Sequence, residues 1–127
     1  MQSACVSDDP AEVRASPVLP VSDLDRALRH YAALGFLTSR WSEDYGFAAW
    51  HGLELHLSVR EGHDPLRTAS AVFLHVADPD AVFAQWSAAD VGRDLAPEDK
   101  PWGVREGAHV DEDGNLLRFG GPLASGG

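Results

Sequence analysis

The acidic stretch Asp111–Asn115, "DEDGN", is the segment that first suggests metal chemistry, because three carboxylates follow one another in it. A calcium loop needs ligands at alternate positions followed by a distant glutamate, and Asp111, Glu112 and Asp113 lack that spacing. Gly114 and Asn115 are residue types that supply the left-handed backbone of a tight connection. We therefore interpret the stretch as a turn that positions the residues around it.

The histidines are the next candidates for chemistry, and none has the H-E-x-x-H or H-x-H spacing of a metal site. We expect most of them to be surface or hydrogen-bonded residues. His56 and His75 differ, because strand alternation points both toward the concave side of a sheet, for either a ligand contact or a structural role. A nucleophile is also lacking: no serine lies in a G-x-S-x-G turn, and the single cysteine, Cys5, falls in an expected N-terminal tail. The sequence thus favours no catalytic residue.

Aromatic residues offer binding rather than catalysis, since flat rings stack on planar ligands with about 0.5–1.5 kcal/mol beyond the burial of area. Each ring could instead pack in the core, and for Trp41, Trp50 and Trp86 we expect core packing. The other candidates are Tyr45, Phe47, Phe73 and Trp102.

Two segments that resemble each other must position these side chains. "SPVLPVSDLDRALRHYAALGF" predicts a strand and then a helix, with Ser22 as N-cap and Gly35 as the end of the helix. "AVFLHVADPDAVFAQWSAADVG" predicts the same pair of elements, with Asp78 as N-cap and Pro79 in the first turn. A constant offset of 55 residues matches Val21 with Val76, Asp23 with Asp78, and Tyr31 with Trp86.

Extended segments follow each helix, so each unit is predicted to be β-α-β-β-β. We expect one α+β domain over 1–127, in which two tandem βαβββ modules, about 14–60 and about 69–120, form a curved mixed sheet. The helices lie outside, the other face is a concave cleft, and both chain ends are flexible tails, the second beginning at Gly120. On the strands, Ala71, Phe73, His75, Glu54 and His56 are expected to face the cleft.

The composition narrows the choice of partners. The chain has 10 Lys plus Arg against 20 Asp plus Glu, a formal net charge of −10. Such a surface repels nucleic acid and anionic membrane and attracts cations. The sequence has no long apolar run and no basic, apolar leader, so we expect a cytoplasmic location without a membrane partner.

Four segments carry a resemblance to a known family: "PVLPVSD", "DYGFAAW", "DPDAVFAQW" and "PWGVREGAHVDEDGNLLRF". They are similar to bleomycin resistance proteins, within the vicinal oxygen chelate superfamily that also contains glyoxalase I and ring-cleaving dioxygenases. The resemblance covers roughly 15–119, most of the chain.

The resemblance also tells where metal-dependent members place their ligands. The first-strand positions fall on Ser16 and Ala71, which supply neither histidine nor carboxylate, and Arg118 stands where such enzymes typically have glutamate. A catalytic divalent metal needs three or more protein ligands, so we expect no metal and no cofactor. A metal-dependent glyoxalase or dioxygenase remains the alternative, resting on Glu54 and His56.

The function implied by the resemblance is the non-catalytic sequestration of a bleomycin-type glycopeptide antibiotic or a related cytotoxic natural product, a cationic aromatic molecule. Another small aromatic metabolite is a further alternative. The family resemblance also implies a homodimer whose clefts are shared between subunits, and Pro17 and Pro20 fit an exchanged first strand. The residues that we expect to bind the ligand are Trp102, Phe47, Phe73, His56, His75, Arg118, Asp44 and Gly103.

Overall fold

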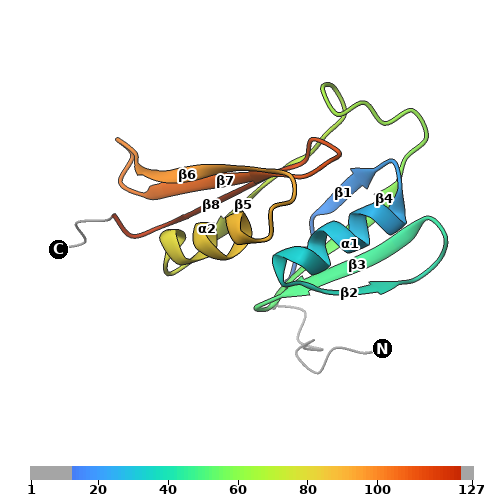
Figure 1. Ribbon diagram of the computed structural model, residues 1–127, viewed down its shortest axis with the longest axis horizontal. Coiled ribbons are helices and arrows are strands. Elements are labelled where there is room, and N and C mark those ends of the chain that lie inside the picture. Colours follow the sequence, from blue (N-terminus) through green and yellow to red (C-terminus); the bar gives the residue numbers. More distant parts are fainter. Residues whose placement is uncertain (1–12, 124–127) are drawn as a thin grey trace.

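The computed structural model describes residues 13–123, so Cys5, most of the first predicted tail and half of the second lie outside the described residues. Figure 1 shows the two modules side by side, with one helix over one face of each sheet. The second tail was predicted to begin too early: Gly120 and Gly121 belong to the last strand, where Gly120 pairs with His75 and Gly121 with Arg105.

Both modules have the element order β-α-β-β-β, which confirms the predicted α+β fold of two repeated units. The first contains β1 (Val18–Val21), α1 (Leu24–Leu34), β2 (Leu37–Arg40), β3 (Tyr45–Trp50) and β4 (Leu53–Val59). The second contains β5 (Ala71–His75), α2 (Pro79–Ala88), β6 (Arg93–Asp99), β7 (Arg105–Val110) and β8 (Leu116–Gly121).

The two sheets have the same topology, with strand orders β1-β4-β3-β2 and β5-β8-β7-β6. In each, the first strand of the module pairs in parallel with the last, so that Val18 lies opposite His56 and Phe73 opposite Arg118. Directly opposed residues share a face of a sheet. The repeat therefore places equivalent side chains on equivalent faces of two separate four-stranded sheets.

The helices begin at equivalent aspartates. Asp23 caps α1 by accepting a hydrogen bond from the backbone N–H of Arg26 (3.0 Å), and Asp78 caps α2 by accepting from that of Ala81 (3.1 Å). The prediction of Asp78 was right, whereas that of Ser22 was wrong by one residue. Ser22 instead forms hydrogen bonds to Asp113 of the other module.

One apolar core lies beneath both helices and joins the modules. Trp86 of α2 is fully buried, and its ring lies 6.1 Å from that of Phe36, 5.2 Å from Trp50 and 5.3 Å from Phe119, measured between centroids. Core packing is therefore confirmed for Trp86 and, by its contacts, for Trp50. It is wrong for Trp41, a residue that is 76% exposed.

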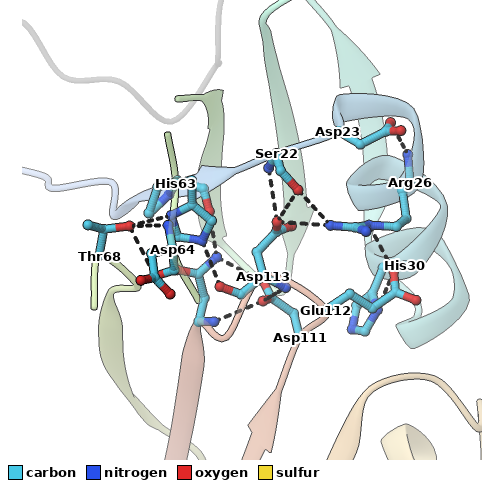
Figure 2. A network of polar contacts seen from close by, with 12 residues as sticks. Ser22, Asp23, Arg26, His30, His63, Asp64, Thr68, Asp111, Glu112 and Asp113 are labelled. Atoms are coloured by element: carbon cyan, nitrogen blue, oxygen red, sulfur yellow. Dashed lines mark hydrogen bonds and ion pairs between the residues drawn. The ribbon is translucent and has the colours of Figure 1, made fainter. Parts of the chain in front are cut away.

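The "DEDGN" turn connects β7 to β8 and fastens the second module to the first (Figure 2). Asp113 accepts hydrogen bonds from the backbone N–H and the hydroxyl of Ser22 and from a guanidinium nitrogen of Arg26, each at 2.9 Å. Gly114 has the expected left-handed backbone, with φ +82°, but Asn115 does not. The side chain of Asn115 instead donates to the carbonyl of Pro20 (2.9 Å) and to Asp111 (3.1 Å).

Two buried histidines extend this contact between the modules. His30 of α1 and His109 of β7 share a hydrogen bond between their Nε2 atoms (2.8 Å), and His109 Nδ1 lies 2.7 Å from a carboxylate oxygen of Asp94. Burial and the neighbouring His109 lower the pKa of His30. We call the following set the polar seam: Ser22, Arg26, His30, Tyr31, His109, Asp111, Asp113 and Asn115.

Candidate functional site

The face of each sheet that is turned away from the helices carries a hollow. On β4, Leu55 and Leu57 are fully buried in the core, so Glu54, His56 and Ser58 lie on the opposite face. The register of β5 and β8 likewise puts Phe73 and Arg118 on the outer face of the second sheet. Strand alternation therefore builds two polar and aromatic surfaces from the same pattern.

Hollow A, on the first sheet, has a volume of about 660 Å³. Three of its rings form a cluster of edge-to-face contacts: centroid distances are 5.8 Å for Tyr45 and Phe47, 5.6 Å for Tyr45 and His56, and 5.0 Å for Phe47 and His56. Mutual packing of this kind holds rings in fixed orientations. The hollow is lined by Trp41, Ser42, Asp44, Tyr45, Phe47, His56, Ser58 and Val59.

A short chain of hydrogen bonds crosses the edge of hollow A. The hydroxyl of Tyr45 lies 2.8 Å from Nδ1 of His56, and Nε2 of His56 lies 3.2 Å from a carboxylate oxygen of Glu54. Both ring nitrogens of His56 are thus engaged by protein groups.

Hollow B, on the second sheet, has a volume of about 570 Å³. The guanidinium carbon of Arg118 lies 5.1 Å from the centroid of the Phe73 ring, within the range of a cation–π contact. The hollow is lined by Phe73, His75, Val76, Trp102, Val104, Arg118, Gly120 and Gly121.

An ion pair on β7 and β8 orients Arg118 in hollow B. Its Nε donates to a carboxylate oxygen of Glu106 at 2.5 Å, and this bond lowers the pKa of Glu106 and raises that of Arg118. Glu106 is buried, whereas the side chain of Arg118 remains 42% exposed. The arginine therefore offers its remaining N–H donors to the solvent side, with its charge balanced from beneath.

The turn between β6 and β7 presents Trp102 beside this pair. Gly103 has a left-handed backbone, φ +91°, and its N–H donates to the carbonyl of Lys100 (3.1 Å), which closes the turn. Trp102 as a whole residue is 63% exposed. Its N–H also contributes to the lowered pKa of Glu106, after the larger effect of Arg118. Trp102 is thus an exposed ring held over the rim of hollow B.

The structure distributes the residues predicted from the sequence over the two hollows. Asp44, Phe47 and His56 line hollow A, and Phe73, His75, Trp102 and Arg118 line hollow B. Gly103 shapes the turn that carries Trp102. The two hollows share no lining residue, so the single concave cleft expected from the sequence corresponds to two separate surfaces in one chain. Contact of these residues with a ligand stays a prediction.

The predicted binding residues did not include Trp41 and Ser58, which line hollow A, or Glu106, which pairs with Arg118, and Tyr45 was considered only as an aromatic ring. Ser58 follows His56 by two residues on one strand, so alternation alone could have indicated it. Tyr45 lies opposite Ser58 in the register of β3 and β4, which requires knowledge of the pairing. Glu106 was missed because its partner, Arg118, lies on the neighbouring strand.

A third cavity, of about 700 Å³, lies where the β3–β4 turn meets α2. Trp50 and Leu53 line one side, and Ala81 and Gln85 line the other. Phe73, His75 and Val76 line this cavity as well as hollow B, because β5 is the edge strand of its sheet. This cavity therefore lies between the modules and shares residues of the β5 region with hollow B.

The positions at which the superfamily's metal enzymes hold their ion do not fit a divalent metal here. Ser16 and Ala71 are exposed, and neither side chain is a usual metal ligand. Arg118 is occupied by Glu106 and carries a positive charge. Within residues 13–123, no group of three or more His, Cys, Asp or Glu side chains is arranged to hold an ion.

The two prolines considered for strand exchange lie at the free edge of the first sheet. The carbonyl of Pro17 accepts from the backbone N–H of His56 (2.9 Å), and Pro20 pairs with Ser58. As an edge strand, β1 needs no N–H from Pro20 on its outer side. Exchange of this strand with a second chain stays a prediction.

Comparison with known proteins gives one matching family and several similar structures. The model of the Glyoxalase/Bleomycin resistance protein/Dioxygenase superfamily matches residues 14–119. No curated protein sequence matches the chain. None of the described helices has the length and apolar character needed to cross a membrane.

The similar structures include a bleomycin resistance determinant and two bleomycin-binding proteins, one of them from a bleomycin-producing organism. A bleomycin resistance determinant encoded on the transposon Tn5 is 28% identical, with a TM-score of 0.81, over 87% of this chain and 98% of that one. A bleomycin-binding protein complexed with bleomycin has 28% identity and a TM-score of 0.80 over the same shares. The bleomycin-binding protein of Streptomyces verticillus, complexed with copper(II)-bleomycin, has 27% identity and a TM-score of 0.72, over 85% and 94% of the two chains.

Proposed function

We propose that this chain, which belongs to the Glyoxalase/Bleomycin resistance protein/Dioxygenase superfamily, binds a bleomycin-type glycopeptide or a related cationic aromatic natural product. It sequesters this molecule and leaves it chemically unchanged. The observation that carries the proposal is the pair of open hollows with exposed aromatic walls, in a fold shared with a protein crystallised with bleomycin.

The chemistry of the hollows supports a ligand with planar rings. Trp102 and Phe73 of hollow B, and Trp41 and Phe47 of hollow A, offer flat surfaces that a heteroaromatic group can stack on. Exposure of an indole to water is unfavourable in free energy, and a ligand that covers the ring removes that unfavourable exposure. Exposure of Trp41 and Trp102 is thus better explained by binding than by folding.

The charge of hollow A supports a cationic group on the ligand. Asp44 lines this hollow, Glu54 lies beside it, and the whole chain carries a formal charge of −10. A cation gains both from these carboxylates and from the face of Trp41. In hollow B, Arg118 is neutralised by Glu106, so it does not repel such a ligand strongly.

We also propose that two copies of the chain form each complete binding groove. A stacked ligand needs a wall on either side, and each hollow provides one wall open to solvent. In a symmetric dimer, hollow A of one chain faces hollow B of its partner. The exposed apolar side chains Leu37 and Leu95, on the same outer faces, would then be covered.

Tagged mixed dimers test this shared groove. Two variants, Phe47→Ala in hollow A and Trp102→Ala in hollow B, are co-expressed with different tags, and the mixed dimer is purified through both. A shared groove predicts that each homodimer binds bleomycin weakly, whereas the mixed dimer regains one tight site, built from the two undamaged hollows. Uniformly weak binding by the mixed dimer contradicts a groove formed between chains.

A second candidate function is a metal-dependent reaction of the glyoxalase or dioxygenase type. The observation in its favour is the contact between His56 and Glu54, two residues able to bind a metal, on the outer face of one sheet. Elemental analysis of the purified protein decides between the two. Stoichiometric nickel, zinc, manganese or iron supports the enzyme, and metal-free protein that binds bleomycin supports sequestration.

A further inference from the structure

The hydrogen-bond chain beside hollow A fixes where its protons lie. The carboxylate of Glu54 can only accept, so Nε2 of His56, 3.2 Å away, must carry a proton. In a neutral imidazole the other nitrogen, Nδ1, is then a bare acceptor. The hydroxyl of Tyr45, 2.8 Å from Nδ1, must therefore donate its only proton to His56.

The consequence concerns the side of Tyr45 that lines the hollow. A phenol whose single proton is already given away keeps only lone pairs for other partners. The edge-to-face contacts of the Tyr45 ring with Phe47 and His56 restrict its reorientation. Tyr45 thus presents a fixed hydrogen-bond acceptor to hollow A, although free tyrosine is both a donor and an acceptor.

The remaining lining of hollow A has the same preference. Asp44 adds a carboxylate, and Ser42 and Ser58 add hydroxyls that accept as well as donate. Among the described residues that line this hollow, none is Lys or Arg. Trp41 adds an exposed aromatic face that favours cations.

We propose that Tyr45, oriented by His56 and Glu54, is a specificity-determining residue that makes hollow A selective for an aromatic ligand with a cationic N–H donor. The ligand class is a primary or secondary ammonium, or an amidinium, attached to a planar ring. This inference rests on the proposed function, because it names the chemical group that the same site recognises. Positive charge alone does not satisfy the site; the cation must carry a proton for Tyr45 to accept.

Two probe molecules separate charge from hydrogen bonding. Naphthylmethylammonium and its N,N,N-trimethyl analogue have the same ring and charge, but only the first has N–H donors. Binding is followed through the indole N–H signal of Trp41 by NMR titration at about pH 8, above the range in which histidine side chains ordinarily take up a proton. A hydrogen bond from a charged donor corresponds to about a tenfold preference for the primary ammonium.

Three variants locate the source of that preference. Tyr45→Phe keeps the ring and removes the fixed acceptor, so the preference for the primary ammonium should fall the most in this variant. His56→Phe keeps a ring but releases the tyrosine proton, so the preference should fall without vanishing. Tyr31→Phe is the matched control, because it removes the other tyrosine hydroxyl of the chain, which is buried against Asp111. Its preference should equal that of the wild type.

The result that overturns the inference is an equal preference in the wild type and Tyr45→Phe, or no preference in the wild type. Bleomycin is titrated into the same preparations to keep the two claims apart. Bleomycin binding with no effect of Tyr45→Phe on the probe ratio contradicts this inference alone. A tenfold probe ratio that depends on Tyr45, without any bleomycin binding, contradicts the proposed drug and supports the ligand class.

Discussion

The polar seam and the two hollows contain the same kinds of residue, yet they differ in whether polar groups remain accessible to a ligand. In the seam, Asp113 is buried and accepts from Ser22 and Arg26, and Asp111 accepts from Tyr31 at 2.7 Å. In the hollows, the guanidinium of Arg118 is partly exposed and Asp44 lines an open surface. A polar cluster thus indicates binding only when some of its hydrogen-bonding capacity is still free.

The seam should dominate stability, and Asp113→Ala is expected to have the largest effect. The change leaves Ser22 and Arg26 without their shared acceptor. It should lower the free energy of unfolding by about 2–3 kcal/mol, below the cost for a fully buried pair because Arg26 is partly exposed. Urea denaturation measures the loss. The neighbouring Glu112, whose side chain is 44% exposed, is the control: Glu112→Ala should cost under about 1 kcal/mol. Equal losses in the two variants contradict a structural role for the seam.

The hollows should dominate binding, and Trp102→Ala is expected to weaken bleomycin binding about 10- to 30-fold by removing one stacking wall. Because the indole is mostly exposed, the free energy of unfolding should change little. Calorimetric titration and urea denaturation measure the two effects on one preparation. Leu66→Ala, at an exposed position outside both hollows, is the control for drug affinity. A large loss of stability without loss of affinity assigns Trp102 to the fold instead.

The buried histidine pair makes the stability that the seam provides depend on pH. Because the pKa of His30 is lowered from 6.5 in the folded protein, the unfolded chain takes up this proton first as the pH falls. The stability that comes from keeping His30 neutral is fully present above pH 6.5. It declines as the pH falls from there toward the pKa of His30 in the folded protein. Burial and His109 lower this pKa, while Asp111, Glu112 and Asp113 oppose the shift.

Comparison of His30→Gln with the wild type isolates this effect. Glutamine can still donate to Nε2 of His109 but does not take up a proton. The variant should therefore lose stability less steeply than the wild type below pH 6.5 in urea denaturation series. His51→Asn, at an exposed turn position with φ 48°, is the control and should keep the wild-type slope. Parallel slopes for His30→Gln and the wild type contradict the lowered pKa.

The smallest effect is expected from metal removal. Dialysis against EDTA should change neither stability nor binding of metal-free bleomycin, because the superfamily's ligand positions here include Ser16, Ala71 and Arg118. Thermal unfolding and calorimetry before and after dialysis provide the check. A drop in either quantity that zinc or nickel restores would place a metal in this protein.

The sequence predicts the elements better than it predicts the contacts between them. The offset of 55 residues predicts two similar modules, and Asp78 followed by Pro79 predicts the second helix cap, because helix caps and apolar stripes are local signals. Ser22 and Asp23 are both good N-caps, and only the contact of Ser22 with Asp113 shows why the second is used. His30 and His109 are 79 residues apart, so no local pattern predicts their contact.

The sequence predicts those site residues whose direction follows from alternation along one strand. It does not predict those whose role depends on how neighbouring strands pair. Alternation places Phe73, His75 and His56 on the outer faces, and the structure agrees. The exposure of Trp41 was not predictable, because it follows β2 in an irregular segment that has no burial pattern. The acceptor role of Tyr45 depends on a cross-strand contact with His56, which only the register of β3 and β4 reveals.

The most direct test of drug binding by the hollows is isothermal titration of the wild-type protein with metal-free and with copper-loaded bleomycin. Sequestration by the hollows predicts saturable heat with a dissociation constant in the micromolar range or below, and one drug molecule for each chain. Absence of any saturable heat at micromolar protein and drug concentrations, for both forms of the drug, would contradict it.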